Sequence, residues 1–228
     1  MADSSPPSTV LDRPLGAAAG RAEGPWRRRW LFALNFLRHP LTVGTLFESS
    51  PALVQRLVQG TDWSRCRTVV ELGPGVGTVT AALLARLPAE ARLYAVERNQ
   101  AFVAELSRAV PDPRLAVLHG SATDLPTLLA AQCLWSADVL VSGIPFSTLP
   151  AAARARVLDA AARLLGAKGQ LLVYQHTRLL LPLLRQRFAR VEVETEWRNA
   201  VPMRVFRCSG AHAGIAGDAA RNGAEPAR

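Results

Sequence analysis

A glycine-rich turn stands where a short apolar run gives way to a helical pattern. Residues 69–77 read VVELGPGVG, which places Gly73, Gly75 and Gly77 directly after a predicted strand. Glycine lets the backbone approach a ligand where a Cβ atom would clash, and it lets a following helix begin close to a sheet. The G-x-G-x-G spacing differs from the G-x-G-x-x-G spacing of turns that hold a pyrophosphate. We therefore expect a nucleoside ligand without a pyrophosphate at this turn.

Two carboxylates accompany the glycine turn. Glu71 stands at the end of the same predicted strand, and Glu97 ends the next strand, 20 positions after Gly77. An acidic residue at about this distance accepts hydrogen bonds from the ribose hydroxyls of a bound nucleotide. Glu71 is placed to face a cationic part of the ligand. S-adenosylmethionine combines a ribose with a cationic methionyl group and has no pyrophosphate, so it is the cofactor that this pattern favours.

The residues after the third predicted strand are candidates for holding an adenine ring. Ser121 and Ala122 follow this strand, and the ring is expected at the carboxyl edge of the sheet. A hydroxyl group bonds adenine less strongly than a carboxylate does. Asp124 is an alternative partner for the ring, although it is equally suited to be the N-terminal residue of a helix.

The fourth predicted strand ends in the sequence VSGIPF at 141–146, at the sheet edge that faces the transferable methyl group. The backbone carbonyl groups of Ser142 and Gly143 are candidates for orienting an acceptor amine. Phe146 is expected to pack beside this amine or its methylated cation. A purely structural turn around the proline is the alternative interpretation.

An alternation of strands and helices must position all these residues. Apolar runs predict strands at 66–72, 91–96, 114–119, 137–142, 169–175, 190–198 and 202–208. Helical patterns predict helices at 78–87, 99–109, 123–132, 150–165 and about 178–188, with Gly166 as a C-cap. The short link between the last two strands permits a hairpin, whereas a parallel crossover needs a dozen or more residues. The pattern predicts a Rossmann-like α/β fold with the seven-stranded sheet of class I methyltransferases and an antiparallel last strand.

Four segments divide the chain. Residues 1–24 and 209–228 are rich in small residues and are expected to be disordered tails. Residues 25–50 begin with an amphipathic helix that is expected to contact a membrane. Residues 51–208 form the expected methyltransferase domain.

The chain resembles the soluble, peripheral bacterial phospholipid N-methyltransferases. The resemblance lies in HPLTVGTLFESS at 39–50, VVELGPGVGTVT at 69–80, VSGIPF at 141–146 and WRNAVPMRVF at 197–206. Enzymes of this family methylate phosphatidylethanolamine toward phosphatidylcholine, and related enzymes act on other amino lipids. The resemblance implies S-adenosylmethionine as cofactor and an amino-lipid headgroup as substrate. Ser121 departs from the family pattern, because an acidic residue is usual at this position.

The resemblance also implies roles for residues near the last three strands. Methyl transfer needs an in-line approach by an uncharged amine, so a group must orient the amine and another must accept its proton. Tyr174, ahead of His176, is the candidate for these roles at the end of the fifth strand. Arg198 and Asn199, beside the final hairpin, are candidates for holding a lipid phosphate. A solvated turn is the alternative for these two residues.

A basic and aromatic segment precedes the domain. At helical spacing, Trp26 and Trp30 fall on an apolar face, while Arg27 and Arg28 lie largely opposite and Arg29 departs slightly from the pattern. Such a helix suits the headgroup region of an anionic membrane. We therefore expect a cytoplasmic protein that binds the inner leaflet peripherally. A helix packed on the domain, or an arm that binds nucleic acid, is the alternative.

Composition limits the remaining possibilities. The net charge of +9 suits an anionic partner, but Lys168 is the only lysine, so codon bias toward arginine also explains the excess. The three cysteines lie far apart, which supports neither a disulfide framework nor a metal site. Two other functions stay open: methylation of adenine in ribosomal RNA, and a non-catalytic role in which the protein binds the cofactor at a membrane or in an assembly.

Overall fold

A seven-stranded sheet forms the centre of the molecule, with the strand order β3-β2-β1-β4-β5-β7-β6. The computed structural model describes residues 49–199 and 201–212. The strands are β1 (Thr68–Leu72), β2 (Arg92–Glu97), β3 (Leu115–His119), β4 (Val139–Ser142), β5 (Gln170–Gln175), β6 (Phe188–Glu196) and β7 (Met203–Ala211). The first five strands are parallel, whereas β7 runs antiparallel to both β5 and β6. The predicted Rossmann-like sheet and its terminal hairpin are therefore confirmed.

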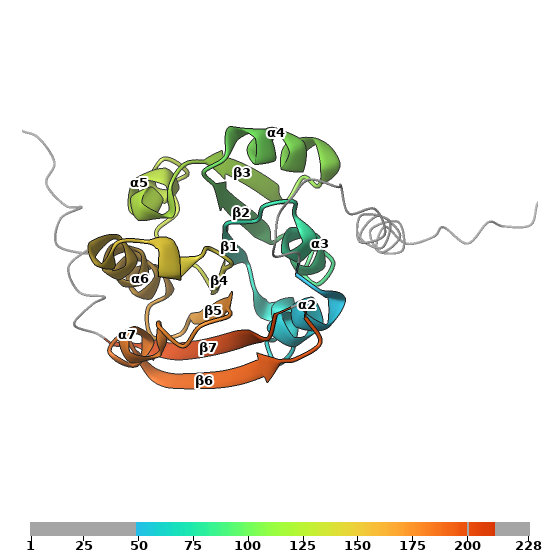
Figure 1. Cartoon of the computed structure of the whole chain (residues 1–228). Helices are drawn as coiled ribbons and strands as arrows, with labels where there is room; N and C mark the ends of the chain where they lie inside the picture. Colours follow the sequence, from blue (N-terminus) through green and yellow to red (C-terminus); the bar gives the residue numbers. More distant parts are fainter. Residues whose placement is uncertain (1–48, 200, 213–228) are drawn as a thin grey trace, which may run out of the picture.

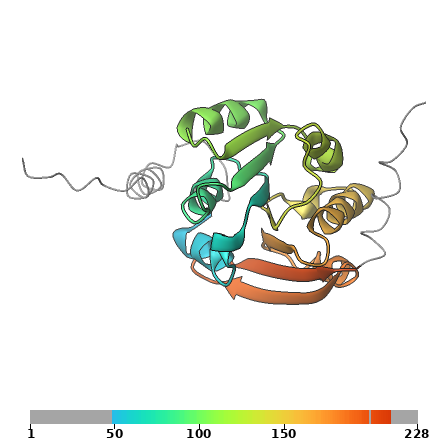
Figure 2. The ribbon, with the colours of Figure 1, turned by 180° about the vertical axis from the view of Figure 1, so that it is seen from behind.

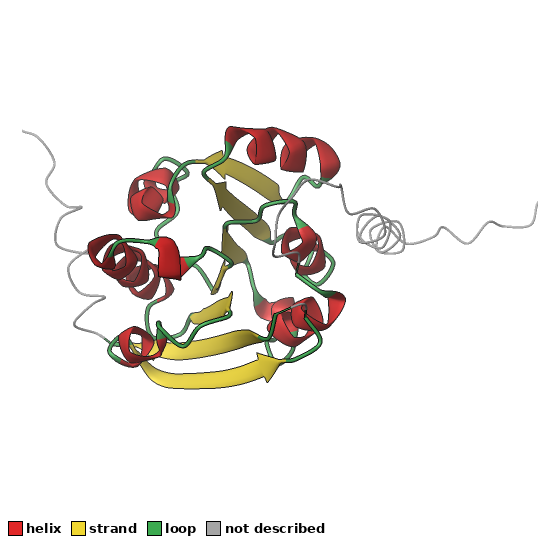
Figure 3. Ribbon diagram, in the orientation of Figure 1, coloured by secondary structure: helices red, strands yellow, loops and turns green. Residues whose placement is uncertain are grey.

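Helices cover both faces of this sheet (Figure 1; Figure 3). One face carries α2 (Pro51–Val58), α3 (Thr78–Leu84) and α4 (Gln100–Ala109). The other carries α5 (Leu125–Ala130), α6 (Ala151–Leu165) and α7 (Leu181–Arg185), and the view from behind shows the same two layers (Figure 2). Short 3-10 turns lie at Trp63–Arg65, Ala122–Asp124 and Phe146–Thr148.

Two hydrophobic cores result from this layering. Alternate residues of a strand point to opposite faces, so Val69 packs in the core beneath α2 and α3 while Val70 packs in the core beneath α5 and α6. Both side chains are fully buried. A parallel sheet that is covered on both faces needs such continuous apolar runs, and these runs are the signal that predicts the strands.

The ends of several elements differ from the prediction. The segment predicted as one helix at 123–132 is divided into a 3-10 turn and α5, and the helix predicted at about 178–188 is shortened to α7. Strand β7 continues into the segment 209–211 that was expected to be a tail, because Ser209 pairs with Gln170 of β5. The amphipathic helix expected within 25–38 lies outside the described residues.

Helix α2 was not predicted from the sequence. Its N-cap is Ser50, whose hydroxyl oxygen accepts a hydrogen bond from the Leu53 amide, and Pro51 occupies the first turn. A serine followed by proline is a recognisable helix start, so the signal was present. The glycine at 166 caps α6 with a φ of 56°, as predicted.

Arg207 of β7 attaches α2 to the sheet. Its side chain is 8% exposed, and its guanidinium donates hydrogen bonds to the carbonyl oxygens of Arg56 and Leu57 near the C-terminal end of α2. Its Nε atom lies 3.2 Å from a carboxylate oxygen of Glu194 on β6. Because the last carbonyl groups of a helix have no partner within the helix, this arginine satisfies groups that would otherwise be buried without one.

Replacing Arg207 with leucine should lower the free energy of unfolding by about 2–3 kcal/mol, because two helix carbonyl groups and Glu194 lose a buried donor. Arg190→Leu is the matched control, since the Arg190 side chain is 76% exposed and lies 3.9 Å from Glu192. The control should change stability by less than about 0.5 kcal/mol. Urea denaturation measures both, and equal losses would show that Arg207 does not anchor α2.

Candidate functional site

A cavity of about 260 Å³ opens at the carboxyl edge of the sheet. It lies where the strand order reverses between β1 and β4, the usual position of ligand sites in open α/β sheets. The glycine turn after β1 and the segments after β4 and β5 line it, together with parts of α2 and α4 and of the β6–β7 hairpin. The residues that line it include Gly73, Gly75, Gly143, Tyr174, His176 and Asn199 from the sequence prediction.

The glycine turn has the geometry that a close ligand requires. Gly73, Gly75 and Gly77 all have positive φ angles, of 72°, 52° and 86°. A Cβ atom on Gly73 would lie 2.9 Å from the Ile144 side chain, whereas one on Gly75 would enter open space. Gly77 is the N-cap of α3. The turn can thus present its backbone to a ligand that lies over Gly75.

Glu97 is connected to this turn through its carboxylate. One oxygen accepts a hydrogen bond from the Gly75 amide at 3.2 Å, and the other accepts from the Asn99 amide at 2.9 Å. These two bonds orient the carboxylate at the end of β2. An ionised carboxylate has about four acceptor positions, so capacity remains for two ribose hydroxyls.

Glu71 lies beneath the cavity rather than on its surface. Its side chain is 1% exposed, and one carboxylate oxygen accepts a hydrogen bond from the Thr80 hydroxyl at 2.6 Å. The other oxygen has no hydrogen-bond partner within the described residues. Burial raises the pKa of Glu71 to about 7, because a charged carboxylate is poorly solvated there. Glu71 is therefore a buried acid and not one of the residues that line the cavity, and its role toward a methionyl group stays a prediction.

The residues predicted for adenine lie on the same edge but outside the cavity lining. The Ser121 hydroxyl lies 2.8 Å from the Thr123 hydroxyl and caps the 3-10 turn that contains Ala122. Asp124 is exposed and occupies the N-cap position of α5, although its side chain makes no capping hydrogen bond. Asp124 therefore lies at the N-terminal end of a helix, as the alternative interpretation of the sequence expects.

Tyr174 and Gly143 meet at the acceptor end of the cavity. A Cβ atom on Gly143 would lie only 2.2 Å from the Tyr174 hydroxyl oxygen, so glycine is required for this close approach. The Ser49 side chain lies near this hydroxyl, and both residues line the cavity. Burial, together with the charge of Glu71, raises the pKa of Tyr174 above its usual value. The phenol is therefore uncharged at neutral pH.

One prediction for the acceptor region needs correction, and another is narrowed to the backbone that it named. Phe146 is 1% exposed and packs in the core with α6, so it does not reach the cavity. The Ser142 side chain is fully buried on β4, and its hydroxyl has no partner within the described residues. Ser142 can take part only through its backbone, as predicted. The VSGIPF segment thus contributes Gly143, Ile144 and Pro145 to the cavity.

Arg198 and Asn199 are adjacent in the β6–β7 link but make different contacts. Arg198 donates two hydrogen bonds to Glu196, a buried carboxylate that also binds Arg56, and the Arg198 side chain is 72% exposed. These bonds use two of the five N–H donors of its guanidinium, so its contact with a lipid phosphate stays a prediction. Asn199 lines the cavity, and its side-chain oxygen accepts a hydrogen bond from the Ser50 amide at 3.0 Å.

Sequence reasoning gave no role to several lining residues, among them Ser49, Phe102 and Met203. Phe102 had a local signal, since it is a half-buried aromatic residue in the first turn of α4. Ser49 and Met203 lie in segments 39–50 and 197–206, which carry the family resemblance, but their neighbours across the cavity come from distant parts of the chain. The membrane-contacting residues predicted in the N-terminal segment (Trp26, Arg27, Arg28, Arg29 and Trp30) lie outside the described residues.

The cysteines and acids of the described part of the chain form no cluster suited to a metal ion. All three cysteines are free, with Cys66 and Cys208 buried and Cys133 exposed. Within residues 49–199 and 201–212, no helix is long and apolar enough to cross a membrane.

Residues 69–169 match the family model of the methyltransferase domain. The chain is 29% identical over 187 residues to an ornithine lipid N-methyltransferase of Singulisphaera acidiphila, which covers 79% of this chain and 95% of that protein. It is 39% identical over 79 residues to ribosomal RNA small subunit methyltransferase A of Thiobacillus denitrificans, but this match covers only 35% of the chain and 30% of that protein.

A solved structure has the same fold. The N-methyltransferase of Bradyrhizobium japonicum, determined with S-adenosyl-L-homocysteine bound, superimposes with a TM-score of 0.61 at 13% identity. The match covers 79% of this chain and 99% of that protein. Because the identity is low, the likeness concerns the fold.

Replacing Glu97 with alanine should weaken S-adenosylmethionine binding by about ten- to a hundredfold, because two ribose hydroxyls lose a charged acceptor. Glu90→Ala is the control, since Glu90 pairs with Arg67 at an exposed site. Isothermal titration calorimetry measures both affinities. Undiminished binding by Glu97→Ala would remove this residue from the ribose site.

The buried Glu71 should make stability depend on pH. Its folded pKa of about 7 lies above the ordinary value of 4.5, so the folded protein keeps a proton that the unfolded chain releases. The free energy of unfolding should therefore fall as pH rises from 4.5 to 7, by about 3 kcal/mol in total, and then level off. Glu71→Gln should lack this fall. Urea titrations across this range test it, and parallel profiles for both proteins would contradict the assignment.

Proposed function

Because the chain belongs to the class I S-adenosylmethionine-dependent methyltransferases, we propose that the group it methylates is the amine of a lipid headgroup. The observation that carries this proposal is the likeness to an ornithine lipid N-methyltransferase over 95% of that protein. Phosphatidylethanolamine and ornithine lipid both carry a primary amine in a polar headgroup. The proposed substrate class is therefore an amino lipid.

The chain's own residues fit the cofactor. When bound, S-adenosylmethionine supplies an activated methyl group on a sulfonium ion. The positive φ angles of the glycine turn leave space over Gly75, and Glu97 is held beside that space by the Gly75 amide. The buried Glu71 has an oxygen without a partner in the described part of the chain, which suits a cationic ligand above it. These features support the proposed binding site.

The acceptor end of the cavity suits an uncharged amine. Of the described residues that line the cavity, none is Asp, Glu, Lys or Arg. A lining of low polarity lowers the pKa of an amine and so favours its nucleophilic, uncharged form. The carbonyl group of Gly143 and the hydroxyl oxygen of Tyr174 are proposed to accept hydrogen bonds from the amine and to aim its lone pair.

Tyr174 is proposed to orient the amine rather than to deprotonate it. Its raised pKa means that the phenol keeps its proton at neutral pH, so no phenolate is present to act as a base. His176 is exposed at the mouth of the cavity and is the proposed acceptor of the proton that the amine loses. In this proposal, Gly143 and Tyr174 orient the amine, and the neighbouring His176 accepts its proton.

Methylation of ribosomal RNA is the second candidate, favoured by the 39% identity to a ribosomal RNA methyltransferase. That match spans about a third of each chain. The sequence SGIPF also has no Asn or Asp ahead of its proline, a residue often present in enzymes that methylate amines of bases. The lipid substrate therefore has the stronger support.

Incubation with S-adenosylmethionine that carries a labelled methyl group tests the proposal. We expect label in the amino lipids of a bacterial lipid extract dispersed in detergent, and none in ribosomal RNA supplied in parallel. Chromatography of the lipids identifies the methylated headgroup. Label in RNA alone, or in neither substrate while the cofactor still binds, would contradict the proposal.

Tyr174→Phe should lower kcat by about ten- to a hundredfold and leave cofactor affinity within about twofold, because the ring is kept while the hydroxyl is lost. Tyr94→Phe is the control, since Tyr94 is the other tyrosine of the chain and packs on the opposite face of the sheet with the core beneath α5 and α6. Steady-state kinetics and calorimetry separate the two effects. An unchanged kcat would exclude Tyr174 from the acceptor site.

A further inference from the structure

Large apolar side chains are exposed around the mouth of the cavity. Among the described residues, four large hydrophobic side chains are exposed, and three of them lie in the two segments that follow β5 and β6. Trp197 is 74% exposed and Val201 42% exposed in the β6–β7 link, and Leu179 is 43% exposed after β5. Exposing such side chains to water is unfavourable unless another surface covers them.

The same two segments border the cavity directly. His176 follows β5, and Asn199 lies between Trp197 and Val201; both line the cavity. The segments are neighbours in space, because Gln175 of β5 pairs with Arg204 of β7 and Arg204 donates a hydrogen bond to the His176 carbonyl oxygen. The two segments that carry the exposed apolar groups therefore border the cavity through His176 and Asn199.

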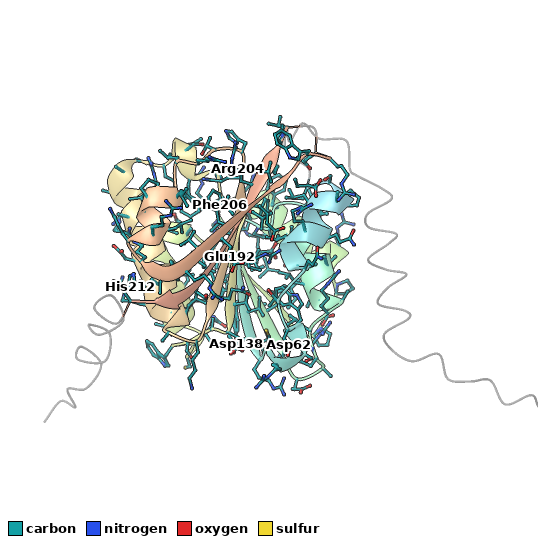
Figure 4. The ribbon with its side chains drawn as sticks, turned by 90° about the horizontal axis from the view of Figure 1, so that it is seen from below. Asp62, Asp138, Glu192, Arg204, Phe206 and His212 are labelled. Atoms are coloured by element: carbon teal, nitrogen blue, oxygen red, sulfur yellow. The ribbon has the colours of Figure 1, made fainter. Side chains whose placement is uncertain are left out.

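The charge around this entrance is positive. The segments 176–180 and 197–204 contain Arg178, Arg198 and Arg204 and no acidic residue. At the hairpin, Glu194 and Glu196 pair with three arginines, Arg56, Arg198 and Arg207, so this ion-pair network keeps an excess of one positive charge. Two aspartates lie far from this entrance: Figure 4 places Asp62 and Asp138 at one end of the molecule and Arg204 at the other.

We propose that this surface, formed by Leu179, Trp197 and Val201 with Arg178, docks the cavity mouth onto an anionic lipid bilayer. Tryptophan is favoured at the boundary between headgroups and acyl chains, and arginines are attracted to anionic headgroups. Docking in this orientation brings the headgroup layer to the acceptor end of the cavity. The inference rests on the proposed function, because a substrate that stays in a membrane requires the cavity to face it.

A bilayer fits this surface better than nucleic acid does. Arginine and tryptophan can contact phosphates and bases, but aliphatic side chains such as Leu179 and Val201 add little to binding a strand of RNA. They do add apolar area that a bilayer can bury. The combination of aliphatic, indole and guanidinium groups therefore points to lipid.

Trp135 supplies a matched control. It is 75% exposed, almost the same as Trp197, but it lies between α5 and β4 at the opposite edge, close to Asp138 in sequence. Replacing either tryptophan with serine removes an equally exposed indole. Only the loss at position 197 should affect docking.

The test uses the full chain and vesicles of phosphatidylcholine and phosphatidylglycerol in roughly a 7:3 ratio, so that the surface carries enough anionic lipid to attract arginine. Trp197→Ser should weaken vesicle binding, measured by sedimentation, by about tenfold, whereas Trp135→Ser should stay within about twofold. Arg178→Gln should reduce the preference for anionic over neutral vesicles. Equal affinities for the two serine variants would overturn the proposal.

Activity separates failure of docking from failure of the proposed function. Methyl transfer to an amino lipid in vesicles should fall in Trp197→Ser, while transfer to the same lipid in detergent micelles should remain at the wild-type rate. Normal micelle activity with unchanged vesicle binding would reject the docking surface and leave the lipid substrate standing. If wild-type protein methylates no lipid in micelles, the proposed function is wrong. The sedimentation assay then still shows whether Trp197 is needed for binding to vesicles.

Misfolding of the variant and binding of nucleic acid are tested separately. Urea denaturation of Trp197→Ser checks that the variant is folded, and Leu179→Ser repeats the vesicle test at a second exposed position. If Trp197→Ser loses affinity for an RNA oligomer and none for vesicles, the surface binds nucleic acid and the proposal is wrong.

Discussion

The antiparallel pairing of β7 with β5 determines where the acceptor end of the site can form. Because β7 begins opposite Gln175, the last residue of β5, the link from β6 enters at the edge where the parallel strands end. Asn199 and Met203 reach the cavity for this reason. A parallel β7 would begin at the opposite edge and would leave the cavity without one of its walls.

The same hairpin holds α2 in place, and α2 in turn connects to the acceptor residues. Arg207 binds carbonyl groups near the end of this helix, and Asn199 accepts a hydrogen bond from Ser50 at its start. Ser49, the residue before, lies near Tyr174 in the cavity wall, and the Tyr174 hydroxyl packs against Gly143. A series of contacts thus connects β7, through α2, to Tyr174 and Gly143. The positions of these two residues therefore depend on α2, which is far from them in sequence.

Two buried glutamates show how the surroundings set charge in this fold. Glu71 and Glu196 are each 1% exposed. Glu196 is bound by Arg56 and Arg198, and these hydrogen bonds hold its pKa well below the usual range. Glu71 accepts a hydrogen bond from the uncharged Thr80 hydroxyl instead of from an arginine, so burial dominates and raises its pKa to about 7. The hairpin carboxylate is a structural anchor, whereas the carboxyl group under the cavity can change its charge when a cation binds above it.

Local features of the sequence determined the strands, the glycine turn and the terminal hairpin. Positive φ angles at Gly73, Gly75 and Gly77 need glycine, and apolar runs covered on both faces form parallel strands, so both could be predicted without knowledge of distant contacts. Only the tertiary structure decided that Phe146 enters the core, that Glu71 lies beneath the cavity and that Ser49 meets Tyr174. These outcomes depend on which elements pack together, and contacts such as that between Ser50 and Asn199 join residues 149 positions apart, a separation over which periodicity carries no information.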